Sequence, residues 1–473
     1  EDKKHSTLQT NINSNPFLSN LYCFITHICN KRFIIFVCSV LCFLSSCQNK
    51  AKKADELCLK YEFEEAAKLY KEAADEGDAY AKWKLSGAYF LGEGVEVDER
   101  KGFRLLEEAA NAGLEEAKAE LAYCYIVGFS TKPDIAKGKK MMDSLVETST
   151  NAFVLSSYAN MLMFGNPAYE KNEKKAIKIL ESVDDTDDPF YLYNMGLVYY
   201  NGIDNDVDYQ KALAYFSKAF ERGRFPGAYV CGGIYYIGGH NVKKNIDKSV
   251  EWFKKGVQAM EAGCMRALGQ IYCSTDEKYR DVNSGIKLLE NAAKLGNTDA
   301  MNYLSMCYEN GENVDKDDEK SINYARKSFE KGNAYAGFLL GLKYQSGVGC
   351  KKNMTKAVEI WEKAADLGSG EAANNAFVYY NGKNNYLKAK KYLFLSAKLG
   401  NHMGMYNLAC QYYGGSKFVE KNLKQAFIYA KKSADLGNPG ACQLTSYMLE
   451  NGQGCDASPK EAKKYKKKAT GEE

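Results

Sequence analysis

The sequence predicts an all-α solenoid, a fold in which short helix pairs stack one after another along the chain. Two observations carry this prediction. A tyrosine-glycine frame and a capping residue each recur about every 36 residues over most of the 473-residue chain. A third observation is the composition, with 45% hydrophobic residues, 26% charged residues and only 7 prolines, which is typical of a folded protein.

The first helix of each pair is predicted by a usually apolar residue, a tyrosine four positions later and a glycine three positions after that. Four-residue spacing places the first two side chains on one helix face, and the glycine ends the helix. The third pair is degenerate, because Leu162 replaces the tyrosine while Gly165 is kept. The frame occurs at residues 85–94, 121–128, 195–202, 231–239, 304–311, 340–349, 375–382 and 408–415.

The second helix of each pair is predicted to begin after an aspartate or asparagine, since these side chains accept a hydrogen bond from an amide of the first turn. Successive caps lie 32 to 38 residues apart. Fifteen residues after most caps comes a glycine, such as Gly113 or Gly368, which suits the left-handed residue that closes a helix. The predicted caps are Asp98, Asp134, Asn172, Asp208, Asn245, Asp281, Asp317, Asn353, Asn385, Asn422 and Asp456.

Residues 62–473 are therefore expected to form a leading helix over 62–76 and about eleven helix pairs. Residues 48–61 are expected to be a short linker. Residues 1–47 are expected to be a targeting segment, because Lys31 and Arg32 precede a 12-residue apolar run that is too short to span a bilayer.

The four residues LSSC that end at Cys47 resemble the lipobox of bacterial lipoproteins. This resemblance implies lipidation of Cys47, export, and anchoring to a membrane by acyl chains, with the outer membrane or the periplasm as the expected location. An uncleaved anchor or a short buried hydrophobic helix is the alternative explanation for the apolar run.

Several classes of function are disfavoured by the sequence. The net charge of +4 leaves no basic field of the kind that nucleic-acid binding requires. No CxxC pair occurs, and His240 and His402 lie several repeats apart, so we expect no metal site, no cofactor and no catalytic residues. The ten cysteines after Cys47 are expected to be small buried hydrophobes, although Cys264 and Cys273, or Cys442 and Cys455, are close enough in sequence for oxidation.

Residues 340–368, LGLKYQSGVGCKKNMTKAVEIWEKAADLG, resemble a Sel1-like repeat. The motif residues present are Leu340, Gly341, Tyr344, Gly347, Gly349, Asn353, Lys356, Ala357, Ala364, Ala365 and Gly368. The resemblance recurs along most of the chain and implies a right-handed αα superhelix of tetratricopeptide-like pairs. It also implies an adaptor in membrane-associated or envelope complexes. A cysteine-rich Helicobacter group of this family is linked to β-lactam hydrolysis, but it carries a cysteine pair in nearly every repeat, which this chain lacks.

Aromatic residues follow the frame tyrosine directly in several pairs. One step along a helix rotates a side chain by about 100°, so these residues are expected to turn toward the inner curve of the stack. Tyrosine combines apolar area with a hydroxyl and suits interfaces. Packing at the edge of each helix pair is the alternative. The candidate binding surface is Phe90, Tyr200, Tyr236, Tyr380 and Tyr413.

The expected function is a non-enzymatic protein–protein scaffold of the bacterial cell envelope. Its expected partner is another envelope protein or an extended peptide segment, bound along the concave face. The alternatives are a periplasmic hydrolase that handles β-lactams or peptidoglycan, and a cell-wall glycan-binding module whose tyrosines stack on sugar rings. The basic C-terminal helix is expected to be the polar end cap of the solenoid, with contact to anionic lipid or polysaccharide as its alternative role.

Overall fold

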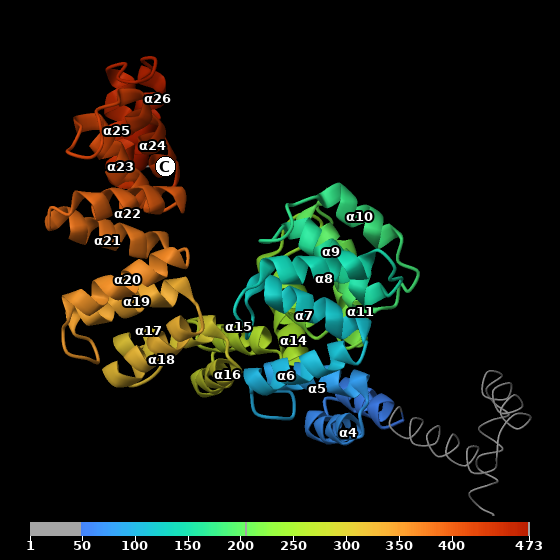
Figure 1. The fold of residues 1–473 in the computed structure, drawn as a ribbon. Helices are drawn as coiled ribbons and strands as arrows, with labels where there is room; N and C mark the ends of the chain where they lie inside the picture. The colour runs from blue at the N-terminus through green and yellow to red at the C-terminus, as the bar shows by residue number, and fades with distance from the viewer. Residues whose placement is uncertain (1–48, 204–205, 472–473) are drawn as a thin grey trace, which may run out of the picture. The chain divides into compact units, whose positions relative to one another are not determined.

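The computed structural model describes residues 49–203 and 206–471, so Cys47 and the predicted targeting segment lie outside the described residues. Within this part of the chain, the helices run from α4 to α26, and the two helices of each pair pack on each other (Figure 1). No β-strand occurs in it; Gly239 and Val242 form an isolated bridge. The described residues form two compact units, an N-terminal unit that ends at Glu261 and a C-terminal unit that begins at Ala262.

The helices of both units are short and nearly equal in length. In the N-terminal unit they are α4 (Phe63–Asp75), α5 (Ala79–Leu91), α6 (Glu99–Asn111), α7 (Glu115–Val127), α8 (Ile135–Val146), α9 (Ala152–Phe164), α10 (Glu173–Glu181), α11 (Pro189–Asn201), α12 (Tyr209–Glu221), α13 (Pro226–Ile237) and α14 (Ile246–Gln258). In the C-terminal unit they are α15 (Ala262–Tyr272), α16 (Val282–Lys294), α17 (Thr298–Asn310), α18 (Asp318–Glu330), α19 (Ala334–Ser346), α20 (Met354–Asp366), α21 (Gly370–Gly382), α22 (Tyr386–Lys398), α23 (His402–Gly414), α24 (Leu423–Asp435), α25 (Pro439–Glu450) and α26 (Pro459–Thr470).

The leading helix has a partner that the sequence analysis does not predict. Residues 49–59, expected to be part of a linker over 48–61, are helical. Ala51 and Ala54 of this helix are buried against Tyr70 of α4, because small side chains let the two helices approach closely. The described residues therefore form twelve helix pairs, close to the eleven predicted: residues 49–59 with α4, then α5 with α6, and so on to α25 with α26.

The capping prediction is confirmed for ten of the eleven second helices. Each of these ten caps accepts a hydrogen bond from the amide three residues further on, as Asp98 does from Lys101 at 3.0 Å. Asp456 is the exception, because α26 begins after Ser458, whose hydroxyl lies 3.4 Å from the amide of Glu461. Pro459 explains the shift, since proline favours the first helical position.

A second hydrogen bond fixes each cap to the first helix of its pair. The backbone amide of the cap donates to a carbonyl near the end of the first helix, usually that of the frame tyrosine, as Asp98 does to Tyr89 at 3.0 Å. In the shortest loop Asn385 donates to Tyr380, the residue after the frame tyrosine, at 2.9 Å. The same bond closes all eleven loops after the leading pair, with Leu162 and Leu449 as acceptors where tyrosine is missing. We call this bond the loop clasp. Four residues separate its two ends in the shortest loop and nine in the longest.

A lysine three residues after the cap lies over the tyrosine of the first helix in eight pairs. Its ammonium group lies between 3.8 and 5.2 Å from the ring centroid. A cation in this position is attracted by the electron-rich face of the ring. The lysines are Lys101, Lys137, Lys175, Lys211, Lys248, Lys320, Lys356 and Lys388.

The first helices lie on the inner side of each unit. They contact the first helix of the next pair directly, as α9 contacts α11 and α19 contacts α21, whereas contacts between second helices are sparser. A curved stack brings the elements on its inner side closer together, so the first helices line the inner face. Glycines allow the close packing within a pair: a Cβ atom at Gly341 would lie 2.1 Å from the buried Trp361 indole. Gly341 is thus a packing residue.

Candidate interaction surface

Exposed apolar side chains are concentrated on the inner, first helices. Of the nineteen large hydrophobic residues that are exposed in the described residues, thirteen lie on first helices, two on second helices and four in loops. Single exposed hydrophobic residues are common on any protein, so an interaction surface is indicated only where several of them share one face.

The C-terminal unit arranges these residues in a regular row. Five successive first helices, α17 to α25, each contribute one residue that is 41 to 55% exposed. Each lies either two or nine positions after the N-cap of its helix, and positions seven apart share one helix face. The residues are Met306, Tyr335, Val378, Met403 and Tyr447, and we call them the inner row.

Polar contacts fix the helices that carry the inner row. The side-chain amide of Asn407 on α23 donates to Asn374 on α21 at 2.8 Å. Lys343 on α19 is only 2% exposed, and its ammonium group lies 2.5 Å from a Glu309 carboxylate oxygen on α17 and 2.6 Å from the Ser321 hydroxyl. Because these bonds join neighbouring pairs, they hold the inner row at a fixed spacing.

The inner face of the N-terminal unit is filled by its own aromatic side chains. The ring centroids of Trp83 and Phe153 lie 5.3 Å apart, and those of Phe153 and Phe190 lie 4.8 Å apart. The Arg224 guanidinium lies 4.7 Å from the Phe190 ring and 5.3 Å from the Tyr193 ring. These residues come from α5, α9, α11 and the loop before α13, so the cluster joins first helices that are far apart in the sequence.

Carboxylates surround this aromatic cluster. The Trp83 indole donates to Glu120 at 2.6 Å. Burial raises the pKa of Glu93 to about 7, an effect that Lys84 and Arg224 oppose in part. Burial also raises the pKa of Glu120 and of Asp188, and it lowers the pKa of Arg224, whose buried Nε has no hydrogen-bond partner. The inner face of this unit therefore holds charges that pack on rings rather than in close ion pairs.

A contact between distant pairs closes the N-terminal unit. Phe225, 7% exposed, lies 5.8 Å from the rings of Tyr61 and Phe63 and 5.8 Å from Phe220. Tyr61 and Phe63 belong to the leading pair, whereas Phe225 caps α13. A late segment of the N-terminal unit thus contacts the leading pair. The inner face of this unit therefore packs against other residues of the same unit.

The aromatic residues that follow the frame tyrosine lie near the loop ends of the helix pairs and contact their own pair or a neighbouring one. Tyr200 stacks on Tyr209 at 5.3 Å, and Phe90 packs on Phe129. The other three positions differ in exposure and bonding. The Tyr380 hydroxyl donates to Glu362 at 2.9 Å and accepts from Lys388 at 3.0 Å, Tyr413 donates to Gln453 at 2.8 Å, and Tyr236 is 45% exposed. A binding role for these five residues stays a prediction.

The inner row has a sequence signal that is independent of residue type. Its members are methionine, tyrosine and valine, so no single residue marks it. Their distance from the N-cap marks the row instead, because a cap fixes where the helix begins and therefore which later positions share a face. Counting two and nine positions from the caps of the first helices narrows the candidates to two per helix, and the structure shows which of the two is apolar and exposed.

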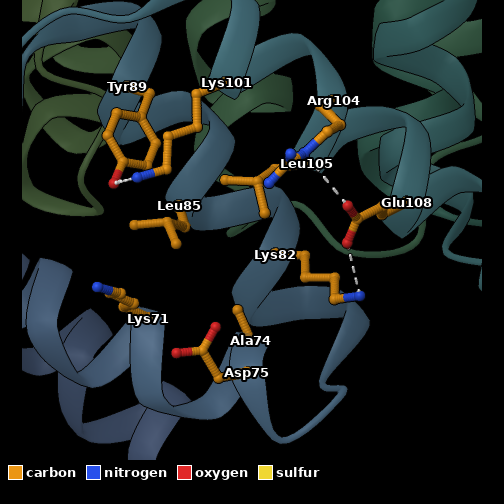
Figure 2. Close-up of a pocket in the computed structure, with 10 residues that line it drawn as sticks. All are labelled: Lys71, Ala74, Asp75, Lys82, Leu85, Tyr89, Lys101, Arg104, Leu105 and Glu108. Atoms are coloured by element: carbon orange, nitrogen blue, oxygen red, sulfur yellow. Dashed lines mark hydrogen bonds and ion pairs between the residues drawn. The ribbon is translucent and has the colours of Figure 1, made fainter.

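Figure 2 shows a pocket of about 280 Å³ between α4, α5 and α6, lined by four cationic and two carboxylate side chains. Three of these six charged side chains are paired with one another. Glu108 lies 2.9 Å from Lys82 and 3.6 Å from Arg104, while Lys101 donates to the Tyr89 hydroxyl (Figure 2). A small anion entering this pocket would compete with Glu108, so the inner row is the stronger candidate surface.

The remaining side chains of residues 49–203 and 206–471 bear on metal binding, membrane spanning and cysteine chemistry. This part of the chain contains no group of three histidine, cysteine or acidic side chains placed to hold a metal ion. None of its helices is long and apolar enough to cross a membrane. Six of the ten cysteines after Cys47 are buried, as expected for small hydrophobic residues, and Cys410 is exposed.

The fold defines a helical-repeat solenoid whose inner face carries the candidate surface. The family model of the Sel1 repeat matches twelve segments of the chain, and the chain belongs to this family. Proteins built from such repeats generally act as protein-interaction scaffolds. The matched residues are 58–78, 79–114, 115–144, 155–182, 189–223, 226–259, 262–297, 298–333, 334–369, 370–401, 402–438 and 439–470.

Solved structures with similar folds come from several bacteria. A protective antigen of uropathogenic Escherichia coli with an SLR fold is 22% identical; the match covers 86% of this chain and 91% of that one, with a TM-score of 0.43. A Sel1 repeat protein from Oxalobacter formigenes is 18% identical, over 72% of this chain and 88% of that one, with a TM-score of 0.37. Cysteine-rich protein B of Helicobacter pylori is 28% identical, over 28% of this chain and 97% of that one, with a TM-score of 0.23. No curated protein matches the chain.

Proposed function

We propose that this protein is a non-enzymatic scaffold of the bacterial cell envelope that binds a partner protein through the inner row of its C-terminal unit. The observation that carries the proposal is the row itself: five exposed apolar side chains, one from each of five successive first helices. A partner that presents apolar side chains at the spacing of the repeat, in an extended or helical segment, fits such a surface.

The polar surroundings of the row support a protein partner. Asn374 and Asn407 present amide groups between the helices that carry Val378 and Met403. Amide side chains bind the backbone of an extended segment well, since each has both donor and acceptor atoms. Tyr335 and Tyr447 add aromatic area, which dominates the energy of many protein interfaces.

The envelope location is part of the proposal and rests on the lipobox-like residues before Cys47. Mass spectrometry of the mature N-terminus in its native host tests it. An acylated cysteine at position 47 is the expected result, and an unmodified N-terminus at another position would remove the lipid anchor from the proposal.

A triple variant tests the inner row. Tyr335→Ser, Met403→Ser and Tyr447→Ser together should lower affinity for the partner by 100-fold or more, since buried anchor residues each contribute on the order of 1–2 kcal/mol. Photo-crosslinking from Val378 in cells, followed by mass spectrometry, identifies the partner, and titration with the purified partner measures the loss. Equal affinity of the triple variant and the wild type would contradict the proposal.

The matched control uses exposed apolar residues of the same unit that lie outside the row. Leu367, Leu399 and Leu436 follow the second helices α20, α22 and α24 and are 38 to 58% exposed. Changing all three to serine should leave binding unchanged. A separate Tyr200/Tyr236/Tyr380/Tyr413→Ala variant tests the aromatic surface predicted from the sequence. Loss of binding in that variant alone would move the interface to the loop side of the pairs.

A further inference from the structure

One edge of the C-terminal unit gathers positive charge that the net charge of the chain conceals. This edge consists of the loop between the two helices of a pair and the first turn of the second helix. In the three pairs α19 to α24 it covers residues 347–357, 383–389 and 415–426. These segments contain eight lysines and one acidic residue, Glu420, and we call the eight lysines the lysine edge: Lys351, Lys352, Lys356, Lys383, Lys388, Lys417, Lys421 and Lys424.

All eight lysines are exposed, and few have an anionic partner. Lys388 lies 2.9 Å from Glu362. Lys356 lies over the Tyr344 ring at 4.4 Å, and Lys417 lies over the Tyr386 ring at 5.0 Å. The positive charge of the edge is therefore turned toward solvent rather than neutralised within the fold.

The same edge of the preceding pairs has the opposite charge. In α15 to α18 the corresponding segments are residues 273–285 and 311–321, which contain eight acidic and four basic residues. The charge thus changes sign along one edge of a single unit. Repeat geometry alone does not require this change, because all these segments have the same backbone role.

An apolar residue projects from the middle of the lysine edge. Leu387, in the first turn of α22, is 85% exposed, the largest value among the exposed large hydrophobic residues of residues 49–203 and 206–471. Beside it, the rings of Tyr386 and Phe418 stack at 5.9 Å and join the edges of two pairs. The lysines and this leucine together offer both positive charge and apolar area on one edge, a combination suited to the interface of a bilayer.

We propose that the lysine edge is a docking surface for an anionic lipid bilayer, with Leu387 entering the interfacial region between the headgroups. Clustered lysines are attracted to the negative surface potential of anionic lipids, and an apolar side chain adds burial that a soluble polyanion does not offer. Residues 347–426 contain no arginine, the residue best suited to two-pronged recognition of a single phosphate. This composition fits a diffuse charged surface better than a specific anion site.

Vesicle co-sedimentation tests the proposal on the full chain carrying Cys47→Ser, which cannot be acylated at that position. The chain should sediment with vesicles that contain 30% phosphatidylglycerol and bind pure phosphatidylcholine vesicles at least tenfold more weakly. Because lipid attraction falls by about fivefold for each lysine lost, K351Q/K383Q/K421Q should lower the partition coefficient by about 100-fold. Leu387→Ser should lower it several-fold even at high salt, where charge is screened.

A control variant removes the same charge from the other end of the same helices. Lys363, Lys398 and Lys432 are exposed and lie in the last turns of α20, α22 and α24. The variant K363Q/K398Q/K432Q should still bind anionic vesicles more tightly than neutral ones. The difference in its binding free energy between the two vesicle types should be at least half of the wild-type difference. Equal losses in both triple variants, or equal binding to neutral and anionic vesicles, would overturn the proposal. Binding of the edge to a single-stranded oligonucleotide but not to vesicles would also overturn it, in favour of a soluble polyanion.

Discussion

The two units of this protein use one repeat for two different inner faces. In the N-terminal unit the position two residues after the N-cap of a first helix holds Phe153 or Phe190, and these rings pack on each other. In the C-terminal unit the same position holds Tyr335 or Met403, which are exposed. Backbone geometry is shared, so side chains at a few positions decide whether an inner face binds itself or remains available to a partner.

The largest expected effect comes from opening the N-terminal unit. Phe225→Ala removes the ring that joins Tyr61 and Phe63 to Phe220, and replacing a buried phenylalanine by alanine costs about 3–5 kcal/mol. Hydrogen exchange measured by mass spectrometry should show faster exchange in residues 49–261 and unchanged exchange in residues 262–471. Tyr335→Ala, at an exposed position of the other unit, should change stability by less than about 0.5 kcal/mol.

A uniform effect of Phe225→Ala on both units would show that the two unfold as one. Unchanged exchange in both would show that the aromatic contact does not hold the N-terminal unit closed. Either result would remove the proposed difference between a self-contacting and an open inner face.

The second prediction concerns close packing, which the two units share. Gly341→Ala should destabilise the C-terminal unit by about 2–3 kcal/mol, since the added Cβ meets the Trp361 indole, which is held by a hydrogen bond to the Phe338 carbonyl. Gly87→Ala in α5 is the matched change in the N-terminal unit, because nothing lies within 4 Å of a Cβ there. That variant should be stabilised by up to about 1 kcal/mol in urea denaturation. Destabilisation by Gly87→Ala would contradict the open space beside this glycine.

The third prediction uses pH to separate the units. Burial raises the pKa of Glu93 to about 7 in the N-terminal unit, so the folded state holds its proton more tightly than the unfolded state. The resulting stability is present below the unfolded pKa of about 4.5 and is lost as pH rises through 7. We expect the N-terminal unit to lose about 1–2 kcal/mol between pH 5 and pH 8.

The C-terminal unit should respond in the opposite sense. Burial alone would raise the pKa of Glu362, but hydrogen bonds from Lys388, Tyr380 and Tyr392 lower it overall. That contribution is present above the unfolded pKa and is lost in acid, below about pH 4.5. Hydrogen exchange of both units, measured from below pH 4.5 up to pH 8, follows the stability change of each unit in one experiment. Glu93→Gln should abolish the loss in the N-terminal unit, and a persistent loss would assign it to Glu120 or Asp188.

The solenoid could be predicted from the sequence because its determinants are local. Caps, frame tyrosines and closing glycines act within one pair, so their periodicity reports the fold directly. The error at the last cap has a local cause too, since Pro459 moves the helix start to Ser458. The helix over 49–59 escaped prediction because its sequence lacks the frame, and its burial depends on α4.

The functional surfaces depend on contacts that sequence periodicity does not report. Phe225 meets Tyr61 across 164 positions of the chain, a distance that no local pattern spans. The lysine edge was hidden because acidic residues at 273–321 offset it in the net charge. The inner row was hidden by its mixed residue types. The family relationship therefore predicts the fold, while the surfaces depend on the individual side chains that each repeat carries.

The loop clasp has a consequence for protein engineering. The same hydrogen bond closes loops of four to nine residues, so the length of the loop can vary without breaking the helix pair. Doubling the length of a closed loop costs only about 0.6 kcal/mol in chain entropy. The exposed parts of the clasped loops are therefore natural insertion points for foreign peptides, each displayed at the end of one helix pair.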